Sequence, residues 1–253
     1  MTATVVVLAD VQDEGAAAVT NAVAARLGGH HVLAVRPADL ARARWSQRIS
    51  ECGAVTTRVV LPGGRILDDH GIGAVLHRLP GVPLGAFRMA RVQDRAYARA
   101  ELNALVAAWL LGLAGRVVGS LCAYGTAPGR LSAVAAQAHA SRCGLPVVRH
   151  SHGAVPAPQG PTARPLHVTR SGRLLVVGAD VVGSLAERYG TACRRLAGRL
   201  GTDLLEVRFT EAEMSHVAAD VDLRPPLDQP EHASAVADLL IGLAERTTPG
   251  GPR

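Results

Sequence analysis

The chain has 253 residues, 48% of them hydrophobic, so it is long enough to bury a sizeable core and to form one or two domains. Its formal charge of +6 comes from 27 basic residues, all arginine, against 21 acidic residues, and the arginines are scattered along the sequence. Nucleic-acid binding favours a basic stripe with aromatic residues for stacking, and aromatic residues make up only 3% of the chain. We therefore expect no nucleic-acid partner.

The four cysteines are too far apart in the sequence for the close pairs of a structural zinc site or a redox motif. They are Cys52, Cys122, Cys143 and Cys193. Their spacing predicts reduced thiols in a cytoplasmic protein. The first apolar run follows no basic region, and the longest apolar stretch, 104–115, is too short to span a bilayer. The expectation is a soluble, cytoplasmic protein that does not bind membranes.

Strand and helix patterns alternate through residues 1–150. They predict, in chain order, a buried strand at 3–10, an amphipathic helix at 13–29, a strand at 30–37, a hairpin at 54–69 and a strand at 73–80. This alternation predicts an α/β domain with a mainly parallel sheet and helices on both faces.

The longest helix is predicted at 92–115, and a short strand follows at 116–120. Apolar residues at helical spacing predict the buried face of this helix. They are Leu102, Leu105, Val106, Trp109 and Leu110. Next comes an Ala-rich helix that stops at Cys143-Gly144 and leads to a strand after Pro146.

Residues 150–165 are rich in proline, glycine and small residues, which is typical of a linker. Beyond them the pattern predicts antiparallel strands in 166–185, with turns at Ser171-Gly172 and Ala179-Asp180. A helix at 186–201, strands at 202–209 and 215–225, and a helix at 231–246 complete the prediction. We thus expect an N-terminal domain at 1–150, a linker at 151–165, a smaller α+β lobe at 166–246 and a disordered tail at 247–253.

The order of these elements resembles the ATP-grasp superfamily, in particular its short carboxylate–amine ligases and ribosomal-peptide maturases. Arg78 on the strand at 73–80 and the Asp94-Arg95 pair followed by Glu101 on the long helix match motifs of the first lobe, the pre-ATP-grasp domain. The resemblance implies that Arg78, Arg95 and Glu101 bind substrate. On local evidence alone, the favoured interpretation is that Arg95 and Glu101 form the polar face of a buried helix.

Two further arginines match positions where the resemblance implies contacts with ATP. Arg130 opens the Ala-rich helix, where the family has a lysine that contacts nucleotide phosphates, and Gly119 replaces an asparagine of the preceding strand. Arginine also binds phosphate oxygens, but with a different geometry. Arg173, ahead of Val176-Val177-Gly178, matches the family's phosphate-binding arginine. A surface helix end for Arg130 and a plain hairpin for Arg173 are the alternatives.

Several parts of an ATP-grasp enzyme have no counterpart in the sequence. The family's second lysine and glycine-rich lid are absent between the helix ending near Cys143 and the strand containing Arg173, where mostly loop-like residues lie. The resemblance implies ATP and Mg²⁺ as cofactors, so this shortening predicts that the grip on ATP is reduced or lost.

The Mg²⁺ ligands that the resemblance implies are also incomplete. Arg208 stands where the first carboxylate is expected, Ala218 replaces a glutamate, and Asp220 takes the place of an asparagine. Carboxylate oxygens suit Mg²⁺, so Asp220 is a candidate ligand, and the nearby Glu206 and Asp222 are two more. Because neighbouring residues of a strand point in opposite directions, the sequence leaves their mutual orientation open.

The histidines of the linker form a second possible metal site. His150 and His152 lie on one side of an extended segment, and His167 is a possible third ligand. Histidines in loops without a neighbouring carboxylate or cysteine are more often ordinary surface residues, so both interpretations stand.

Two functional hypotheses follow, and no catalytic residue is assigned. The first is a degenerate or minimal ATP-dependent carboxylate–amine ligase acting on a peptide or small carboxylate, in peptide or natural-product metabolism. The second is a noncatalytic binding or scaffold protein that binds a small acid, a peptide or a partner enzyme. A protein partner or a homodimer is compatible with either hypothesis, and the sequence does not decide whether the protein is an enzyme.

Overall fold

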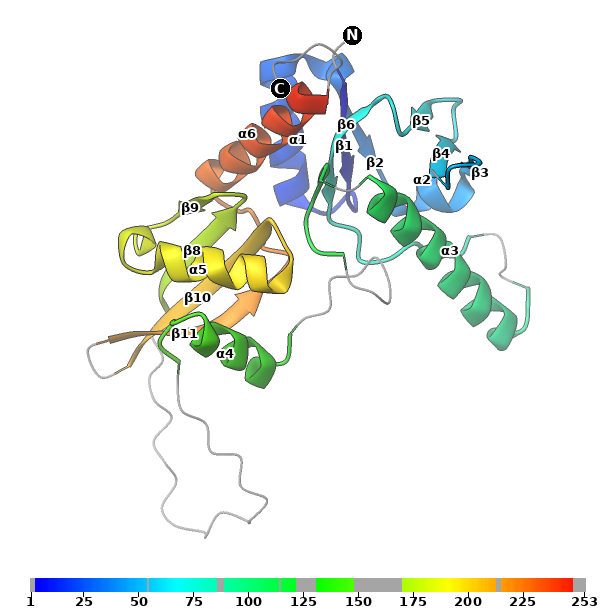
Figure 1. Cartoon of the computed structure of the whole chain (residues 1–253). Coiled ribbons are helices and arrows are strands. Elements are labelled where there is room, and N and C mark those ends of the chain that lie inside the picture. Colours follow the sequence, from blue (N-terminus) through cyan, green and yellow to red (C-terminus); the bar gives the residue numbers. More distant parts are fainter. Residues whose placement is uncertain are drawn as a thin grey trace.

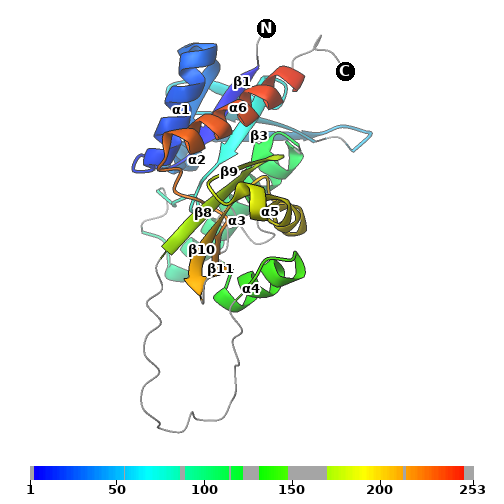
Figure 2. The ribbon, with the colours of Figure 1, turned by 90° about the vertical axis from the view of Figure 1, so that its left-hand side faces the viewer.

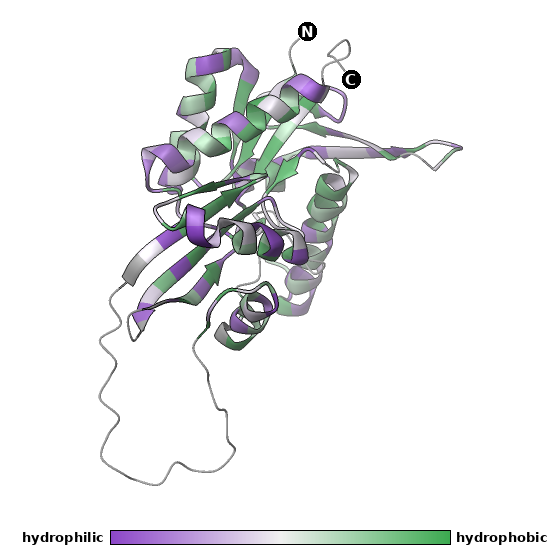
Figure 3. Ribbon diagram, turned by 60° about the vertical axis from the view of Figure 1, so that its left-hand side comes forward, coloured by the Kyte–Doolittle hydropathy of each residue, from purple (hydrophilic) through white to green (hydrophobic). Residues whose placement is uncertain are grey.

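The structure is a computed structural model of the chain, and it describes residues 3–53, 55–85, 89–113, 115–121, 131–147, 170–212 and 215–247. Two four-stranded sheets form the centre of the molecule, with helices packed on their faces (Figure 1). The strands of the first sheet are mostly hydrophobic, whereas the strands of the second sheet and the helices combine hydrophobic and hydrophilic residues (Figure 3).

The first sheet consists of parallel strands in the order β2-β1-β6-β7. These strands are β1 (Thr4–Leu8), β2 (Val32–Val35), β6 (Ile72–His77) and β7 (Val117–Val118). All six residues of β6 are buried. Such uninterrupted burial is typical of a parallel strand covered on both faces. The mainly parallel N-terminal sheet predicted from the sequence is confirmed.

One face of this sheet is covered by α1 (Glu14–Leu27) and α6 (Pro230–Thr247), which lie side by side in both views (Figures 1 and 2). Val5 and Leu76 of the sheet belong to the same buried cluster as Val19 of α1 and Leu240 of α6. Gly73 allows the close approach of α6, because a Cβ atom at this position would lie 2.8 Å from Ala244. The last helix of the chain thus completes the first sheet.

The opposite face is covered by α2 (Pro37–Arg42), by α3 (Val92–Gly112) and by a small antiparallel sheet. Its strands are β3 (Arg44–Ile49), β4 (Val55–Val60) and β5 (Ile66–Asp68); a short 3₁₀ helix, η1 (Gly29–His31), precedes β2. The hairpin of β4 and β5 was expected from the sequence, whereas β3 was not.

The buried face of α3 agrees largely with the apolar spacing. Val106, Trp109 and Leu110 are buried. Leu102 and Leu105 are half-buried, and Leu102 packs against the buried cluster that contains the other three. The indole Nε1 of Trp109 donates a hydrogen bond to Asp69 Oδ1 at 3.1 Å, which satisfies its polar atom inside the core.

The second sheet is antiparallel, in the order β11-β10-β8-β9. Its strands are β8 (Arg170–Val177), β9 (Asp180–Val182), β10 (Leu204–Ala212) and β11 (Ser215–Asp222). On one face it packs against α4 (Ala133–Arg142) and α5 (Ala186–Leu200). There the rings of Tyr189 and Phe209 stack with centroids 5.0 Å apart.

The predicted turn at Ser171-Gly172 is wrong, because β8 runs through both residues. Gly172 lies opposite Phe209 of β10, next to a shift in the pairing register, and a Cβ at Gly172 would lie 2.7 Å from Leu185. A glycine at a strand irregularity or close approach gives the same local pattern as a turn glycine. The turn predicted at Ala179-Asp180 lies one residue earlier, at Gly178-Ala179, and joins β8 to β9, which begins at Asp180.

Two helices connect the parts of the chain that the sequence assigns to separate domains. α4, expected within the N-terminal domain, packs against β11 and α5 of the second sheet. α6, expected within the C-terminal lobe, packs mainly on α1 and β6. The boundary at 151–165 lies outside the described residues and stays a prediction. In the described part of the chain, no helix is both long and apolar enough to cross a membrane.

Candidate functional site

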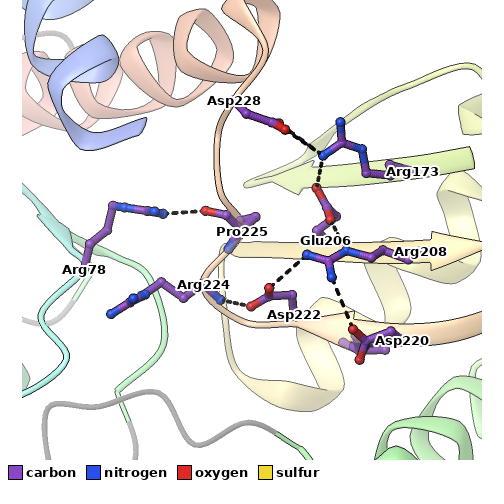
Figure 4. Close-up of polar contacts among 10 residues, drawn as sticks. Arg78, Arg173, Glu206, Arg208, Asp220, Asp222, Arg224, Pro225 and Asp228 are labelled. Atoms are coloured by element: carbon purple, nitrogen blue, oxygen red, sulfur yellow. Dashed lines mark hydrogen bonds and ion pairs between the residues drawn. The ribbon is translucent and has the colours of Figure 1, made fainter. Parts of the chain in front are cut away.

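The two sheets approach each other at the loop between β11 and α6. Arg78, directly after β6, has an exposed fraction of only 3%. Its Nε and Nη2 donate to both carboxylate oxygens of Asp13. Its Nη1 donates to the backbone oxygen of Pro225 at 2.7 Å (Figure 4). Arg78 therefore joins the start of α1, the first sheet and the loop that leads into α6.

One face of the second sheet carries five charged side chains. Glu206 lies opposite Asp222, and Arg208 lies opposite Asp220 on one side and Arg173 on the other. Directly opposed residues of neighbouring strands share a face, and so do residues two apart on one strand. The pairing register therefore gathers all five side chains, and it settles the orientation that the sequence left open.

Arg208 is the centre of this charged cluster (Figure 4). Its Nε donates to Glu206 Oε1 at 2.7 Å, its Nη2 to Asp222 Oδ2 at 3.2 Å, and its Nη1 lies 3.5 Å from Asp220 Oδ2. The hydrogen bond to Glu206 and the attraction of the three carboxylates raise the pKa of Arg208, although partial burial opposes the shift. One guanidinium thus contacts three acidic residues and offsets part of their combined charge.

Glu206 is the most deeply buried of these acids, with no exposed surface. Its Oε1 accepts from Arg208, whereas its Oε2 has no hydrogen-bond partner among the described residues. Arg173 Nη1 lies 3.8 Å from this Oε2 and forms an ion pair with it. The buried carboxylate therefore lies between two guanidinium groups.

Arg173 also connects the cluster to the loop before α6. Its Nη1 donates to both carboxylate oxygens of Asp228 at 3.1 Å. Partial burial raises the pKa of Asp228, but the hydrogen bond and attraction from Arg173 outweigh it, so the pKa lies below its usual value. Asp228 therefore stays ionised and holds Arg173 in place.

His232, in the first turn of α6, is a buried neighbour of the cluster. Its exposed fraction is 1%, and its Nδ1 has no hydrogen-bond partner among the described residues. Burial lowers the pKa of His232, and the positive charge of Arg173 lowers it further, whereas Glu206 and Asp228 oppose the shift. The imidazole is therefore neutral near pH 7.

A cavity of about 830 Å³ is lined by residues that follow β1 and β6 of the first sheet and by residues of the second sheet and the loop after it. Asp10 comes from the turn after β1, Asp13 and Glu14 from the start of α1, and Arg208, Asp222 and Arg224 from the second sheet and the loop after it. Arg224 is exposed, and its guanidinium has no ion-pair partner among the described residues. The cavity is thus polar and carries both signs of charge.

The structure brings some of the predicted site residues together and leaves others apart. Arg78 and Asp222 line the cavity, together with Arg208, which was not a predicted site residue, and Arg173 reaches its edge through Asp228. Glu206 and Asp220 belong to the charged cluster. In contrast, Arg95 and Glu101 are exposed on α3 and do not line the cavity. Outside the described residues lie Arg130, His150, His152 and His167.

Sequence reasoning missed four residues of this region. Asp13 was read only as part of a helix start, although an acidic residue at that position is a strong N-cap signal. Asp228 and His232 flank the start of α6, and Arg224 lies in the preceding loop. No local pattern marks these last three, because their roles depend on contacts with distant strands.

The acidic residues do not fit a divalent metal as they are arranged. Mg²⁺ needs near-octahedral oxygen ligands at about 2.0–2.1 Å from one point. Glu206, Asp220 and Asp222 each direct an oxygen to a different nitrogen of Arg208. Among the described residues, no group of three or more His, Cys, Asp or Glu side chains is placed to share one metal ion.

The chain matches no protein-family model, and no curated protein is similar to it in sequence. Several solved structures are similar in fold. The ATP-grasp ligase PsnB, complexed with a phosphomimetic variant of a minimal precursor, Mg and ADP, has a TM-score of 0.66 at 17% identity, covering 96% of this chain and 99% of that one.

Two other solved structures show a similar likeness. The macrocyclase MdnB from Microcystis aeruginosa MRC has a TM-score of 0.61 at 14% identity, covering 94% of this chain and 99% of that one. A RiPP-associated ATP-grasp ligase from Chryseobacterium gregarium, in complex with ADP and with a leader and core peptide, has a TM-score of 0.61 at 11% identity, covering 94% and 96%. Together with the mainly parallel first sheet and the antiparallel second sheet, these likenesses show that the chain has the fold of the ATP-grasp superfamily.

Proposed function

We propose that this protein is a degenerate ATP-grasp ligase of the peptide-modifying type, which binds a peptide or a small carboxylate in the cavity between its sheets. In this proposal the use of ATP is reduced or lost. The contacts of Arg208 with Glu206, Asp220 and Asp222 carry the proposal. These acids are the candidate Mg²⁺ ligands, and one oxygen of each already contacts the guanidinium of Arg208.

The choice of a peptide or carboxylate rests on the fold and on the cavity. The similar structures include ligases in complex with precursor peptides. In this chain, Arg224 lines the cavity, and its guanidinium has no ion pair among the described residues. It is suited to a carboxylate, because arginine binds such groups with two parallel hydrogen bonds. Asp10 and Glu14, on the opposite wall, are suited to an amine.

In ATP-grasp ligases, bound Mg·ATP supplies the phosphoryl group that activates the carboxylate. The residues of this chain would do other parts of the work. Arg224 would orient the carboxylate of the substrate. Arg173, held by Asp228, would supply positive charge beside the charged cluster. Because Arg208 already pairs with the three candidate metal ligands, tight binding of Mg·ATP at these acids is unfavourable.

A second candidate function is a noncatalytic binding protein, and a separate observation favours it. Two of the three described arginines that the resemblance implied for ligand contacts already have acidic partners: Arg78 pairs with Asp13, and Arg173 pairs with Asp228. Paired guanidinium groups offer less charge to a phosphate. In this case the protein would bind its peptide or partner without any nucleotide.

Calorimetric titration with Mg·ATP, beside a Mg²⁺-free control, tests the proposal. We expect binding weaker than about millimolar, which corresponds to a free energy less favourable than roughly −4 kcal/mol. The titration should depend little on Mg²⁺. A micromolar, Mg²⁺-dependent dissociation constant would contradict the degenerate assignment.

An assay of ADP release separates the two candidate functions. A ligase with reduced activity should release ADP slowly from millimolar ATP when a peptide rich in carboxylates and amines is present, and an Arg173→Ala variant should lose this release. A noncatalytic protein should release none above the rate of the Arg173→Ala variant.

A further inference from the structure

The charged cluster of the second sheet has the composition of a cation site with its cation built in. A divalent-metal site collects carboxylate oxygens from neighbouring strands around one positive centre. Here the three carboxylates of Glu206, Asp220 and Asp222 surround the guanidinium of Arg208, at distances of 2.7, 3.5 and 3.2 Å (Figure 4). Each acid contacts a different nitrogen.

The shape of the guanidinium explains how one side chain serves three acids. It is planar, permanently charged and carries five N–H donors in a fixed arrangement. The strand register presents Glu206 from the same strand, two residues before Arg208, and the other two acids from β11. The strand register therefore places each of the three acids next to a different nitrogen of the guanidinium.

Burial makes this pairing more than a surface ion pair. Glu206 has no exposed surface, and a buried carboxylate without a counter-charge is strongly unfavourable. A metal ion entering the cluster would have to lie within a few ångströms of the guanidinium, where the two positive charges repel each other in a partly buried site. The guanidinium and a divalent cation thus exclude each other.

We propose that the guanidinium of Arg208 is the resident cation of this cluster, standing in place of a divalent metal ion, and that its removal turns Glu206, Asp220 and Asp222 into a divalent-cation site. The inference deepens the proposed function, on which it partly rests, because it names the residue that keeps Mg²⁺ out. It concerns the metal alone and involves no nucleotide.

Mn²⁺ binding to the full chain, measured by electron paramagnetic resonance without nucleotide, tests the inference. The wild type should not bind Mn²⁺ below about millimolar concentration. The Arg208→Ala variant should bind Mn²⁺ at least tenfold more tightly than the wild type. In this variant, loss of either Asp220 or Asp222 by substitution with Asn should weaken the new binding again.

Arg224→Ala is the matched control for charge. Arg224 lines the same cavity but has no ion pair with the cluster among the described residues, so its loss removes one positive charge and leaves the three acids paired. Its Mn²⁺ affinity should stay within about twofold of the wild type. An increase equal to that of Arg208→Ala would show a general charge effect and overturn the inference.

Two substitutions keep the test decisive if Arg208→Ala does not fold. Arg208→Asn places a short oxygen ligand in the cluster, and its folding should be recovered by added Mn²⁺, seen as a rise in Tm. Arg208→Lys keeps a cation and should remain without Mn²⁺. Folded Ala or Asn variants that bind no Mn²⁺, an Asn variant that Mn²⁺ does not recover, or micromolar Mn²⁺ binding by the wild type, would each overturn the inference.

The inference and the proposed function fail in different ways. If the wild type binds Mg·ATP tightly but does not bind Mn²⁺ without nucleotide, the degenerate-ligase proposal is contradicted and Arg208 remains the resident cation. If the wild type binds Mg·ATP weakly and the Arg208→Ala variant gains no Mn²⁺ binding, the degenerate-ligase proposal stands and the inference about Arg208 fails.

Discussion

Arg78 and Asp13 form a bidentate ion pair between the end of β6 and the start of α1, with Nε–Oδ2 and Nη2–Oδ1 distances of 2.8 and 3.1 Å. Both side chains are largely shielded, with exposed fractions of 4% and 13%. Asp13 Oδ1 also accepts from the backbone N–H of Ala16 and so caps α1. A single carboxylate thus fixes the helix, the arginine and, through Arg78, the loop at Pro225.

Asp13→Asn should lower the free energy of unfolding by about 3–5 kcal/mol, because it leaves the buried guanidinium of Arg78 without a counter-charge. Asparagine keeps the helix cap, so the loss reports on the ion pair. Denaturant unfolding measures the change. The control is Asp238→Asn in the exposed pair with Arg26, which should cost less than about 1 kcal/mol. Equal losses in both variants would contradict the assigned role of burial.

Gly15→Ala should destabilise the protein although alanine favours helices. Gly15 lies in the first turn of α1, and a Cβ atom there would collide with the backbone oxygen of Pro226 and lie 2.9 Å from Leu227 Cβ. Overpacking of this kind costs about 1–3 kcal/mol. Gly198→Ala in α5 is the matched control, because no atom lies within 4 Å of its added Cβ. It should stabilise the protein by up to about 1 kcal/mol in the same unfolding measurement.

His232 should make stability fall as the pH drops below about 6.5, the usual pKa of histidine. Burial lowers the pKa of His232 in the folded protein, so the unfolded chain takes up the proton first. The unfolded state then binds more protons, and stability rises with pH between the folded and the unfolded pKa.

The test compares the free energy of unfolding of the wild type and His232→Gln at about pH 7.5 and about pH 5. The wild type should lose more stability on acidification than the variant. Other titrating groups, including the neighbouring Asp228 and Glu231, are present in both proteins and largely cancel in the difference. Parallel pH profiles would show that His232 titrates as in the unfolded chain.

Thiol labelling should separate the exposed cysteine from the buried ones. Burial, and to a lesser extent the neighbouring Cys143, raises the pKa of Cys193 to about 12, so hardly any thiolate forms near neutral pH. Cys143 is also buried, whereas Cys52 is exposed. Cys52→Ser should remove one equivalent of rapid labelling of the native protein by a disulfide reagent, and Cys193→Ser should remove none. Rapid loss at Cys193 would contradict its burial.

Much of the architecture follows from the sequence alone. The uninterrupted apolar runs at β1 and β6 and the helical spacing of Val106, Trp109 and Leu110 are local patterns, and local patterns carry strand and helix periodicity directly. The resemblance of short motifs to ATP-grasp proteins likewise pointed to the fold that the solved structures share.

The site depended on contacts between distant parts of the chain. The sequence shows that Arg208 stands where a metal-binding carboxylate was expected, but only the register of β10 and β11 shows that it lies between Glu206, Asp220 and Asp222. A shift of one residue in that register would have turned the acids of β11 to the opposite face.

The placement of the last helix has the same origin. Its amphipathic pattern predicted a helix with a buried side, and nothing in that pattern says which sheet it covers. The tertiary structure packs α6 against α1 and β6, with Gly73 providing the close contact. The sequence by itself determined the elements and their apolar faces, because these depend on neighbours along the chain. The tertiary structure decided which faces meet and which charges pair, because those energies arise between residues far apart in sequence.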